Sequence, residues 1–236
     1  METTASRSTY LLVFLFFAAV LASYSLVESS LFTLTEVEVR GAETLDPERI
    51  RQMSGLVPGE SLFTLDLGAV EERLREEPRV ASVRARRRWP DGVILSVVER
   101  RPLALLSNEG TWLAVDPSAV LFPADPGWKG ALPILTGVDA GTGAPGSALG
   151  EQGRRLLGLL SGPAAPISQR ASELHLDEQG EVILYLRDPV RVQLGRLDLA
   201  PSRLPVLLAV LRDLDARGAR PTEIDLRFDS PVIRSR

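Results

Sequence analysis

The feature that most constrains this chain is an uncharged apolar stretch near its N-terminus. Residues 10–27 read YLLVFLFFAAVLASYSLV and contain no charged side chain. As an α-helix that rises ~1.5 Å per residue, this stretch is about 27 Å long, just enough to cross the hydrocarbon core of a bilayer. We therefore predict a transmembrane helix over residues 10–27, behind a cytoplasmic tail of residues 1–9. The side chains expected to anchor it include Tyr10, Leu15, Phe17, Leu21 and Val27.

The charges beside this stretch predict its orientation. Arg7 is the only basic residue ahead of it, and Glu28 follows it directly. Basic residues favour the cytoplasmic side, so the bulk of the chain is expected outside the cytoplasm. A competing interpretation is a cleaved signal peptide, because Val20 and Ala22 form the small-residue pattern of a cleavage site. Apolar character continues past that site, which favours an uncleaved anchor, and both interpretations export the remainder.

Composition narrows the chemistry of the exported part. The 236 residues are 44% hydrophobic and 25% charged, which is typical of one or two packed domains. A net charge of −4 argues against nucleic acid as a partner. The chain has no cysteine and one histidine, His175, and it lacks a glycine-rich phosphate loop. No metal, cofactor or small-molecule substrate is expected, and His175 is interpreted as a solvated strand residue because no Gly-x-Ser-x-Gly motif accompanies it.

The first exported segment, residues 32–101, has the pattern β-α-α-β-β. Alternating residues 35–40 predict a strand. Asp46 before Pro47 caps a helix that Gly55 ends, and Asp66 caps a second helix that ends at Pro78. Two further strands, residues 80–88 and 93–100, are joined by the hairpin sequence Trp-Pro-Asp-Gly.

The remaining residues, 102–236, predict a larger domain with an extended antiparallel sheet and helices. Turn signals and alternation place its elements along the chain. Strands are expected at residues 112–115, 120–122, 174–176, 182–186, 190–194, 223–228 and 230–234, and helices at 149–160 and 202–217. The fold class is therefore α+β: one N-terminal transmembrane helix, then the β-α-α-β-β domain, then this mixed domain.

The last strand is expected at an edge of the sheet. Such a strand carries unpaired N–H and C=O groups that can accept a strand from another protein. Pro231 and the basic residues Arg234 and Arg236 suit an edge position. The alternative, that Val232 and Ile233 complete the core or fray, is left open by the pattern alone.

A basic run in the first domain has two interpretations. Arg84, Arg86, Arg87 and Arg88 could meet anionic lipid or an acidic partner. They could instead form a charged exposed strand face that pairs with the glutamates of residues 71–77. Trp89, which follows them, is interpreted as a packed turn residue.

In order and spacing, these signals resemble the FtsQ family of bacterial division proteins, called DivIB in other bacteria. The resemblance starts from the single apolar helix followed by ordered short motifs. They are Val37–Gly41, Gly59–Phe63, Leu74 with Pro78-Arg79-Val80, Arg88-Trp89-Pro90, Val98–Pro102, Leu132–Gly137, the Leu194-Gly195-Arg196 stretch and Ile224–Phe228. Two departures stand out: Ala119 replaces a glycine in the family's VDxxGxxF turn, and Phe228 replaces a tyrosine.

The resemblance implies a POTRA domain over residues 32–101 and a C-terminal β domain over 102–236. It implies a non-enzymatic, single-pass inner-membrane scaffold that binds FtsB and FtsL by strand addition at its last strand, with the POTRA domain aiding localisation to the septum. The partner-binding residues it implies are Arg196, Arg227, Phe228, Ser230, Val232 and Ile233. The alternatives are an exported POTRA-containing assembly or secretion protein and a secreted hydrolase with a cleaved signal peptide.

Overall fold

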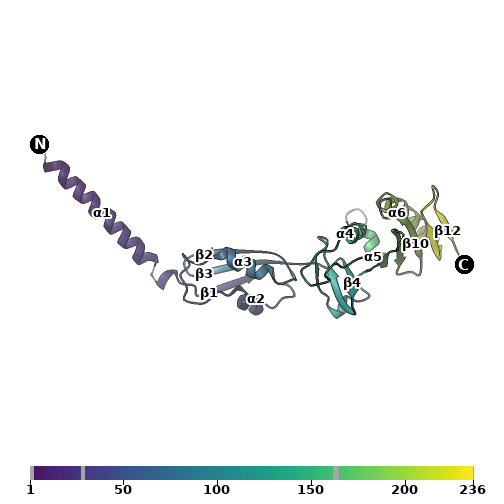
Figure 1. The fold of residues 1–236 in the computed structure, drawn as a ribbon, viewed down its shortest axis with the longest axis horizontal. Coiled ribbons are helices and arrows are strands. Elements are labelled where there is room, and N and C mark those ends of the chain that lie inside the picture. Colours follow the sequence, from purple (N-terminus) through teal and green to yellow (C-terminus); the bar gives the residue numbers. More distant parts are fainter. Residues whose placement is uncertain (1–2, 28–29, 162–164, 236) are drawn as a thin grey trace. The chain divides into compact units, whose positions relative to one another are not determined.

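The computed structural model describes residues 3–27, 30–161 and 165–235, which divide into two compact units, residues 1–99 and 100–236 (Figure 1). The N-terminal stretch forms helix α1, Thr3–Val27, on which Tyr10, Leu15, Phe17 and Leu21 are exposed. The side chain of Val27 lies outside the described residues. Among the described residues, no helix combines the length and the apolar character that a membrane crossing requires. The spanning helix predicted over residues 10–27 therefore stays unconfirmed.

After α1 and the short helix η1, Ser30–Phe32, the first unit has the predicted β-α-α-β-β order. Its elements are β1 (Glu36–Arg40), α2 (Pro47–Ser54), α3 (Leu67–Arg75), β2 (Val80–Arg88) and β3 (Gly92–Glu99). Strand β3 lies in the centre, parallel to β1 and antiparallel to β2. The predicted caps are confirmed, because Asp46 accepts from the N–H of Glu48, Asp66 accepts from the N–H of Ala69, and Gly55 ends α2 in the left-handed conformation.

The carboxylate of Glu99 ties the end of β3 to the loop before α2. It accepts hydrogen bonds from the N–H groups of Glu43 (2.7 Å), Thr44 (3.0 Å) and Leu45 (2.9 Å), and from the Thr44 hydroxyl. Desolvation by partial burial opposes ionisation, but these donors prevail and hold the pKa of Glu99 below its ordinary value.

We expect Glu99→Gln to destabilise the first unit by about 2 kcal/mol at neutral pH, because hydrogen bonds to a charged acceptor contribute ~1.5–3 kcal/mol. A folded pKa below the unfolded one means that ionised Glu99 stabilises the fold above pH ~4.3. That contribution is lost as the pH falls through the folded pKa, so the difference between the two proteins should shrink in acid. Urea unfolding followed by the fluorescence of Trp89, the only tryptophan of residues 1–99, measures this difference in the free energy of unfolding. A difference that does not change with pH contradicts the ionic role.

The second unit contains one nine-stranded sheet. Its strands are β4 (Ala104–Asn108), β5 (Thr111–Val115), β6 (Leu121–Pro123), β7 (Ile134–Thr136), β8 (Ala171–Leu176), β9 (Glu181–Leu186), β10 (Arg191–Arg196), β11 (Glu223–Asp225) and β12 (Val232–Arg234), and its helices are η2 (Pro126–Trp128), α4 (Glu151–Gly158), α5 (Ala165–Arg170) and α6 (Ala200–Arg217). The order across the sheet is β12-β11-β10-β9-β8-β7-β4-β5-β6.

The sheet is mixed, so the prediction of an antiparallel sheet is wrong for part of it. Strand β4 pairs with β7, β7 with β8, and β10 with β11 in parallel. The β10–β11 pair arises because α6 crosses over between the two strands, and a parallel connection needs such a crossover. The predicted strand pairs β5–β6 and β8–β9 are antiparallel as expected, whereas strand β4 was not predicted.

Helices cover one face of the C-terminal half of this sheet. Leu204, Leu207, Leu211 and Leu214 of α6 are buried in one core with Leu174, Leu184, Val192 and Ile224 of the strands. Helix α6 begins at Ala200, two residues before the predicted start, and Gly218 ends it as expected. On the other side, a small separate core around Leu105 and Phe122 packs against Trp112, Trp128 and Leu132.

The glycine missing from the turn between β5 and β6 is replaced by a left-handed alanine. Ala119 has φ 65° and is buried. The turn is held by buried Asp116, which accepts from the N–H groups of Ser118 and Val120, both at 3.0 Å, and pairs with Arg100 at 2.7 Å. The turn therefore forms without glycine because a side chain fixes it.

Restoring the glycine should stabilise the protein. A left-handed non-glycine residue costs ~1–2 kcal/mol, and loss of the buried methyl contact offsets part of that gain. We expect Ala119→Gly to raise the free energy of unfolding by about 0.5–1 kcal/mol in urea denaturation. A lower free energy of unfolding would contradict this view of the turn.

Candidate functional site: the C-terminal edge of the sheet

Strand β12 occupies one edge of the nine-stranded sheet, as predicted for the last strand. It pairs antiparallel with β11 through Glu223 and Arg234, Ile224 and Ile233, and Asp225 and Val232. Within the described residues it has a strand neighbour on one side only. An edge strand directs half of its N–H and C=O groups away from the sheet, where a strand of another protein can bind them.

The two apolar side chains of β12 lie on opposite faces. Ile233 stands beside buried Ile224 on the face that α6 covers, whereas Val232 stands beside Asp225 on the polar face. Val232 is 41% exposed and Ile233 is 42% exposed. Neither side chain completes the core, so the alternative interpretation of these two residues is not supported by their burial.

Phe228 alternates in the sequence with Leu226 but does not join the core. Leu226 is buried, while Phe228 is 63% exposed. The predicted strand over residues 223–228 ends at Asp225, because the Asp225 carboxylate accepts from the backbone N–H of Arg227 (3.0 Å) and turns the chain. Phe228 and Ser230 lie in the bend between β11 and β12, and Ser230 is exposed.

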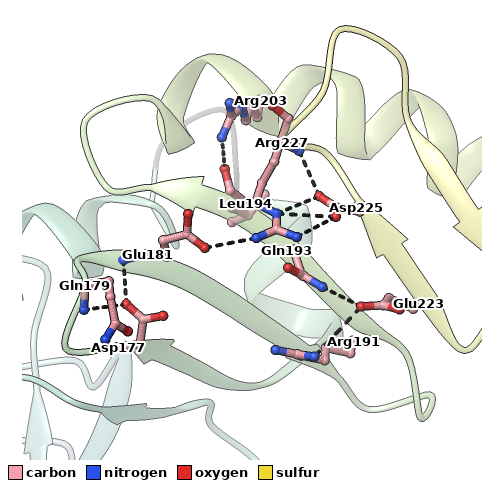
Figure 2. Close-up of polar contacts among 10 residues, drawn as sticks. All are labelled: Asp177, Gln179, Glu181, Arg191, Gln193, Leu194, Arg203, Glu223, Asp225 and Arg227. Atoms are coloured by element: carbon pink, nitrogen blue, oxygen red, sulfur yellow. Dashed lines mark hydrogen bonds and ion pairs between the residues drawn. The ribbon is translucent and has the colours of Figure 1, made fainter.

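Arg227 holds this bend against the sheet (Figure 2). Its guanidinium pairs with Asp225 at 2.9 Å and with Glu181 of β9 at 3.2 Å. The Asp225 side chain is buried. Its hydrogen bond from Arg227 lowers the pKa of Asp225 below the ordinary value. The same pairing raises the pKa of Arg227, so both charges persist at neutral pH.

Two further contacts fix the bend from behind. Arg203 of α6 donates to the carbonyl oxygens of Leu194 and Arg227. Asp177 accepts from the N–H groups of Gln179 (3.0 Å) and Glu181 (2.8 Å), which sets the turn that presents Glu181 (Figure 2). The position of Phe228 therefore depends on residues from three strands and one helix.

A second polar cluster stabilises β12 at its other end. Glu223 accepts a hydrogen bond from Gln193 and pairs with Arg234 at 2.8 Å and Arg191 at 3.8 Å. The hydrogen bond from Gln193, followed by the charges of these arginines, lowers the pKa of Glu223. Positive and negative side chains thus alternate across the polar face, from Arg191 of β10 through Glu223 of β11 to Arg234 of β12.

Arg196 lies at the end of β10, beside the same bend. Its register partner is Glu181, the residue that also binds Arg227. The exposed Arg196 guanidinium pairs with Asp198 at 3.1 Å, and that contact lowers the pKa of Asp198. The structure thus brings Arg196 together with the continuous segment from Arg227 to Ile233.

The other candidate residues lie elsewhere. His175 shares a 2.7 Å contact with the Thr136 hydroxyl, which also donates to Glu173. In the basic run, Arg87 donates to backbone carbonyl oxygens of Leu62 and Leu65, and Arg88 pairs with Glu36. Of the two interpretations of the run, pairing with the glutamates of residues 71–77 is not supported for Arg87 and Arg88, because their described contacts are with other groups, and Glu71 pairs with Arg75 within α3. Arg236 lies outside the described residues.

Comparison with known proteins decides the family. Residues 32–100 match the family model "POTRA domain, FtsQ-type", and residues 97–227 match "Cell division protein FtsQ/DivIB, C-terminal". The chain belongs to the FtsQ/DivIB family of cell division proteins. The β-α-α-β-β part of the first unit, from residue 32 on, is therefore its POTRA domain, and the mixed α+β second unit contains its C-terminal domain.

Individual FtsQ proteins agree with this assignment. The chain is 31% identical over 203 residues to the cell division protein FtsQ of Anaeromyxobacter sp. (strain K), covering 84% of this chain and 69% of that one. It is 27% identical over 233 residues to FtsQ of Syntrophotalea carbinolica, and the match covers 92% of this chain and 82% of that one. A solved extracytoplasmic domain of DivIB from Geobacillus stearothermophilus is 21% identical in sequence, and the match covers 50% of this chain and 96% of that one. Its TM-score is 0.35, a likeness too distant to add to the assignment.

The FtsQ/DivIB match ends at Arg227, immediately before the candidate edge. Beyond the matched residues lie Phe228, Ser230, Val232 and Ile233. The geometry of the edge strand supports their role. The polar residues that hold the edge, Asp225, Glu181 and Glu223, were not singled out from the sequence. For Glu223 and Asp225, the alternation of polar and apolar residues in 191–193 and 223–225 is the signal that could have indicated them.

Proposed function

We propose that this chain is a non-enzymatic, single-pass scaffold of the division machinery that binds FtsB- and FtsL-like proteins through strand addition at β12. The observation that carries the proposal is the uncovered edge strand, whose Val232 and Ile233 are exposed on the two faces of the sheet. An added strand would continue the ladder and cover both side chains. Membership of the FtsQ/DivIB family supports the choice of division proteins as partners.

The proposed contact set is compact. Val232 and Ile233 supply apolar area, Phe228 and Ser230 lie in the bend at the start of the strand, and Arg227 and Arg196 supply positive charge beside it. Main-chain pairing contributes ~0.5–1.5 kcal/mol per hydrogen bond, so three residues of edge need side-chain contacts to reach useful affinity. We further propose that the POTRA domain aids localisation to the septum.

Membrane attachment is the second part of the proposal. The uncharged residues 10–27 support an anchor in the inner membrane, with the chain that follows them outside the cytoplasm. Alkaline carbonate extraction of cell membranes together with N-terminal sequencing tests it. The anchor predicts an extraction-resistant protein that retains residue 10, whereas cleavage after Ala22 and release by carbonate contradict it.

Calorimetric titration of residues 32–236 with the extracytoplasmic parts of the host's FtsB–FtsL pair tests the binding function. Saturable binding is expected. Absence of binding by protein with a normal unfolding transition would contradict the scaffold proposal and leave the family assignment intact.

A further inference from the structure

Three aromatic side chains converge at one end of the POTRA domain; we call Phe32, Phe63 and Trp89 the aromatic patch. The ring centroids of Phe32 and Phe63 are 5.3 Å apart, those of Phe32 and Trp89 5.8 Å, and those of Phe63 and Trp89 4.9 Å. Despite these contacts Phe63 is 40% exposed and Trp89 51% exposed. Leu31, which precedes Phe32, is exposed as well. Exposed apolar clusters of this kind mark interaction sites.

The patch is held together by the fold. The N–H of Leu62 donates to the carbonyl of Phe32 (2.8 Å), which joins the segments of Phe32 and Phe63. Arg87 donates to the carbonyl oxygens of Leu62 and Leu65 on either side of Phe63. The turn that carries Trp89 is fixed by Asp91, which accepts from the N–H (2.8 Å) and the hydroxyl (2.7 Å) of Thr35. Helix η1 and two turns therefore present one aromatic surface whose segments are joined by hydrogen bonds.

The chain tethers this surface to the end of α1. Val27 is the last residue of the helix, and Phe32 follows five residues later. A fully extended chain spans at most ~3.6 Å per residue, so the patch cannot lie more than ~18 Å from the end of α1. If that helix spans a bilayer, the tether keeps the patch within ~18 Å of the edge of the hydrocarbon core, so the patch can reach the headgroup layer, which is ~5–8 Å thick on each side.

We infer that the aromatic patch binds lipid at the boundary between headgroups and acyl chains, and so fixes the POTRA domain on the membrane surface. Aromatic rings, tryptophan above all, are favoured at this depth because an apolar ring and a polar N–H meet both environments. This inference rests on the proposed membrane anchor. It adds a second contact with the membrane, made by the folded domain itself.

Quenching of Trp89 by brominated lipid tests the inference. The full chain carrying Trp112→Phe and Trp128→Phe, in which Trp89 is the only tryptophan, is reconstituted into phosphatidylethanolamine/phosphatidylglycerol vesicles. With lipid brominated near the top of its acyl chains, Trp89 emission should fall to about half, because a ring at the headgroup boundary touches the bromine atoms. Lipid brominated near the chain ends should quench less. Phe63→Asp should abolish the quenching, while Leu199→Asp, at an exposed apolar residue of the second unit, should not.

The failures can be told apart. If the chain resists carbonate extraction from the vesicles, the proposed anchor stands. If brominated lipid then leaves Trp89 emission unchanged, the lipid-binding inference is overturned, and a protein partner becomes the proposed occupant of the patch. If carbonate releases the chain, the proposed anchor fails and the inference fails with it. Unchanged unfolding of Phe63→Asp in urea confirms that its effect arises at the surface.

Discussion

Val232→Glu should weaken binding of the FtsB–FtsL pair by about 100-fold, which corresponds to the ~2–3 kcal/mol typical of a central interface residue. Val232 lies on the polar face of β12 and is paired in register with Asp225. A glutamate there places a second carboxylate beside Asp225 and must lose water when a strand is added. Calorimetric titration measures the loss, and the stability of the free protein should change little because Val232 is 41% exposed.

Val206→Glu is the matched control for this experiment. Val206 is 43% exposed on α6 of the same unit, so the substitution makes the same chemical change at nearly the same exposure. Its binding should equal that of the parent protein. Equal losses in both variants would show that added negative charge, not the edge strand, controls the association, and would contradict the proposed site.

Arg227→Met should destabilise the second unit by about 2 kcal/mol. Removing one member of a buried ion pair costs ~3–5 kcal/mol, and the Arg227 side chain is only partly buried, so the expected value is lower. The substitution leaves the buried carboxylate of Asp225 with the backbone N–H of Arg227 as its remaining described hydrogen bond. Urea denaturation at neutral pH measures the change. Because the folded pKa of Asp225 is lowered, the effect should diminish as the pH falls through that folded pKa.

The double variant Asp225→Asn/Arg227→Met distinguishes the contribution of the ion pair to stability from the contribution of Arg227 to partner binding. It removes both charges, so most of the lost stability should return. A guanidinium has five N–H donors. In the described side-chain contacts of Arg227, Nε–H contacts both carboxylate oxygens of Asp225, Nη1 donates once to Glu181 and Nη2 once to Asp225, which leaves one donor on each Nη for a partner. Binding should therefore stay ~10-fold weaker than in the parent, as for a charge-assisted hydrogen bond. Full recovery of binding would show that Arg227 only positions the bend.

Local signals in the sequence predicted much of the fold. Asp46 and Asp66 cap their helices as expected, because capping depends on residues within one turn. The Trp-Pro-Asp-Gly hairpin and the alternating leucines of β8 and β9 were equally readable, since turn chemistry and period-two burial are local properties. These elements needed no knowledge of their distant neighbours.

Long-range pairing could not be read in the same way. The parallel contacts of β7 with β4 and β8 join segments far apart in the chain, and β7 is only three residues long. The edge position of β12 was indicated by Pro231 and Arg234, which suit an edge strand, yet the polar face that holds it was missed. Its central ion pair joins Arg227 to Glu181, 46 positions away, so no local pattern connects them.

Amide hydrogen exchange of residues 32–236, free and bound to the FtsB–FtsL pair, tests strand addition most directly. Strand addition predicts new protection at those amides of residues 232–234 whose N–H groups point away from β11 and gain partners in the added strand. The opposite edge strand, β6, serves as the internal control and should exchange at the same rate in both states. Binding that leaves the amides of β12 unprotected, or that protects β6 instead, would contradict the proposed edge.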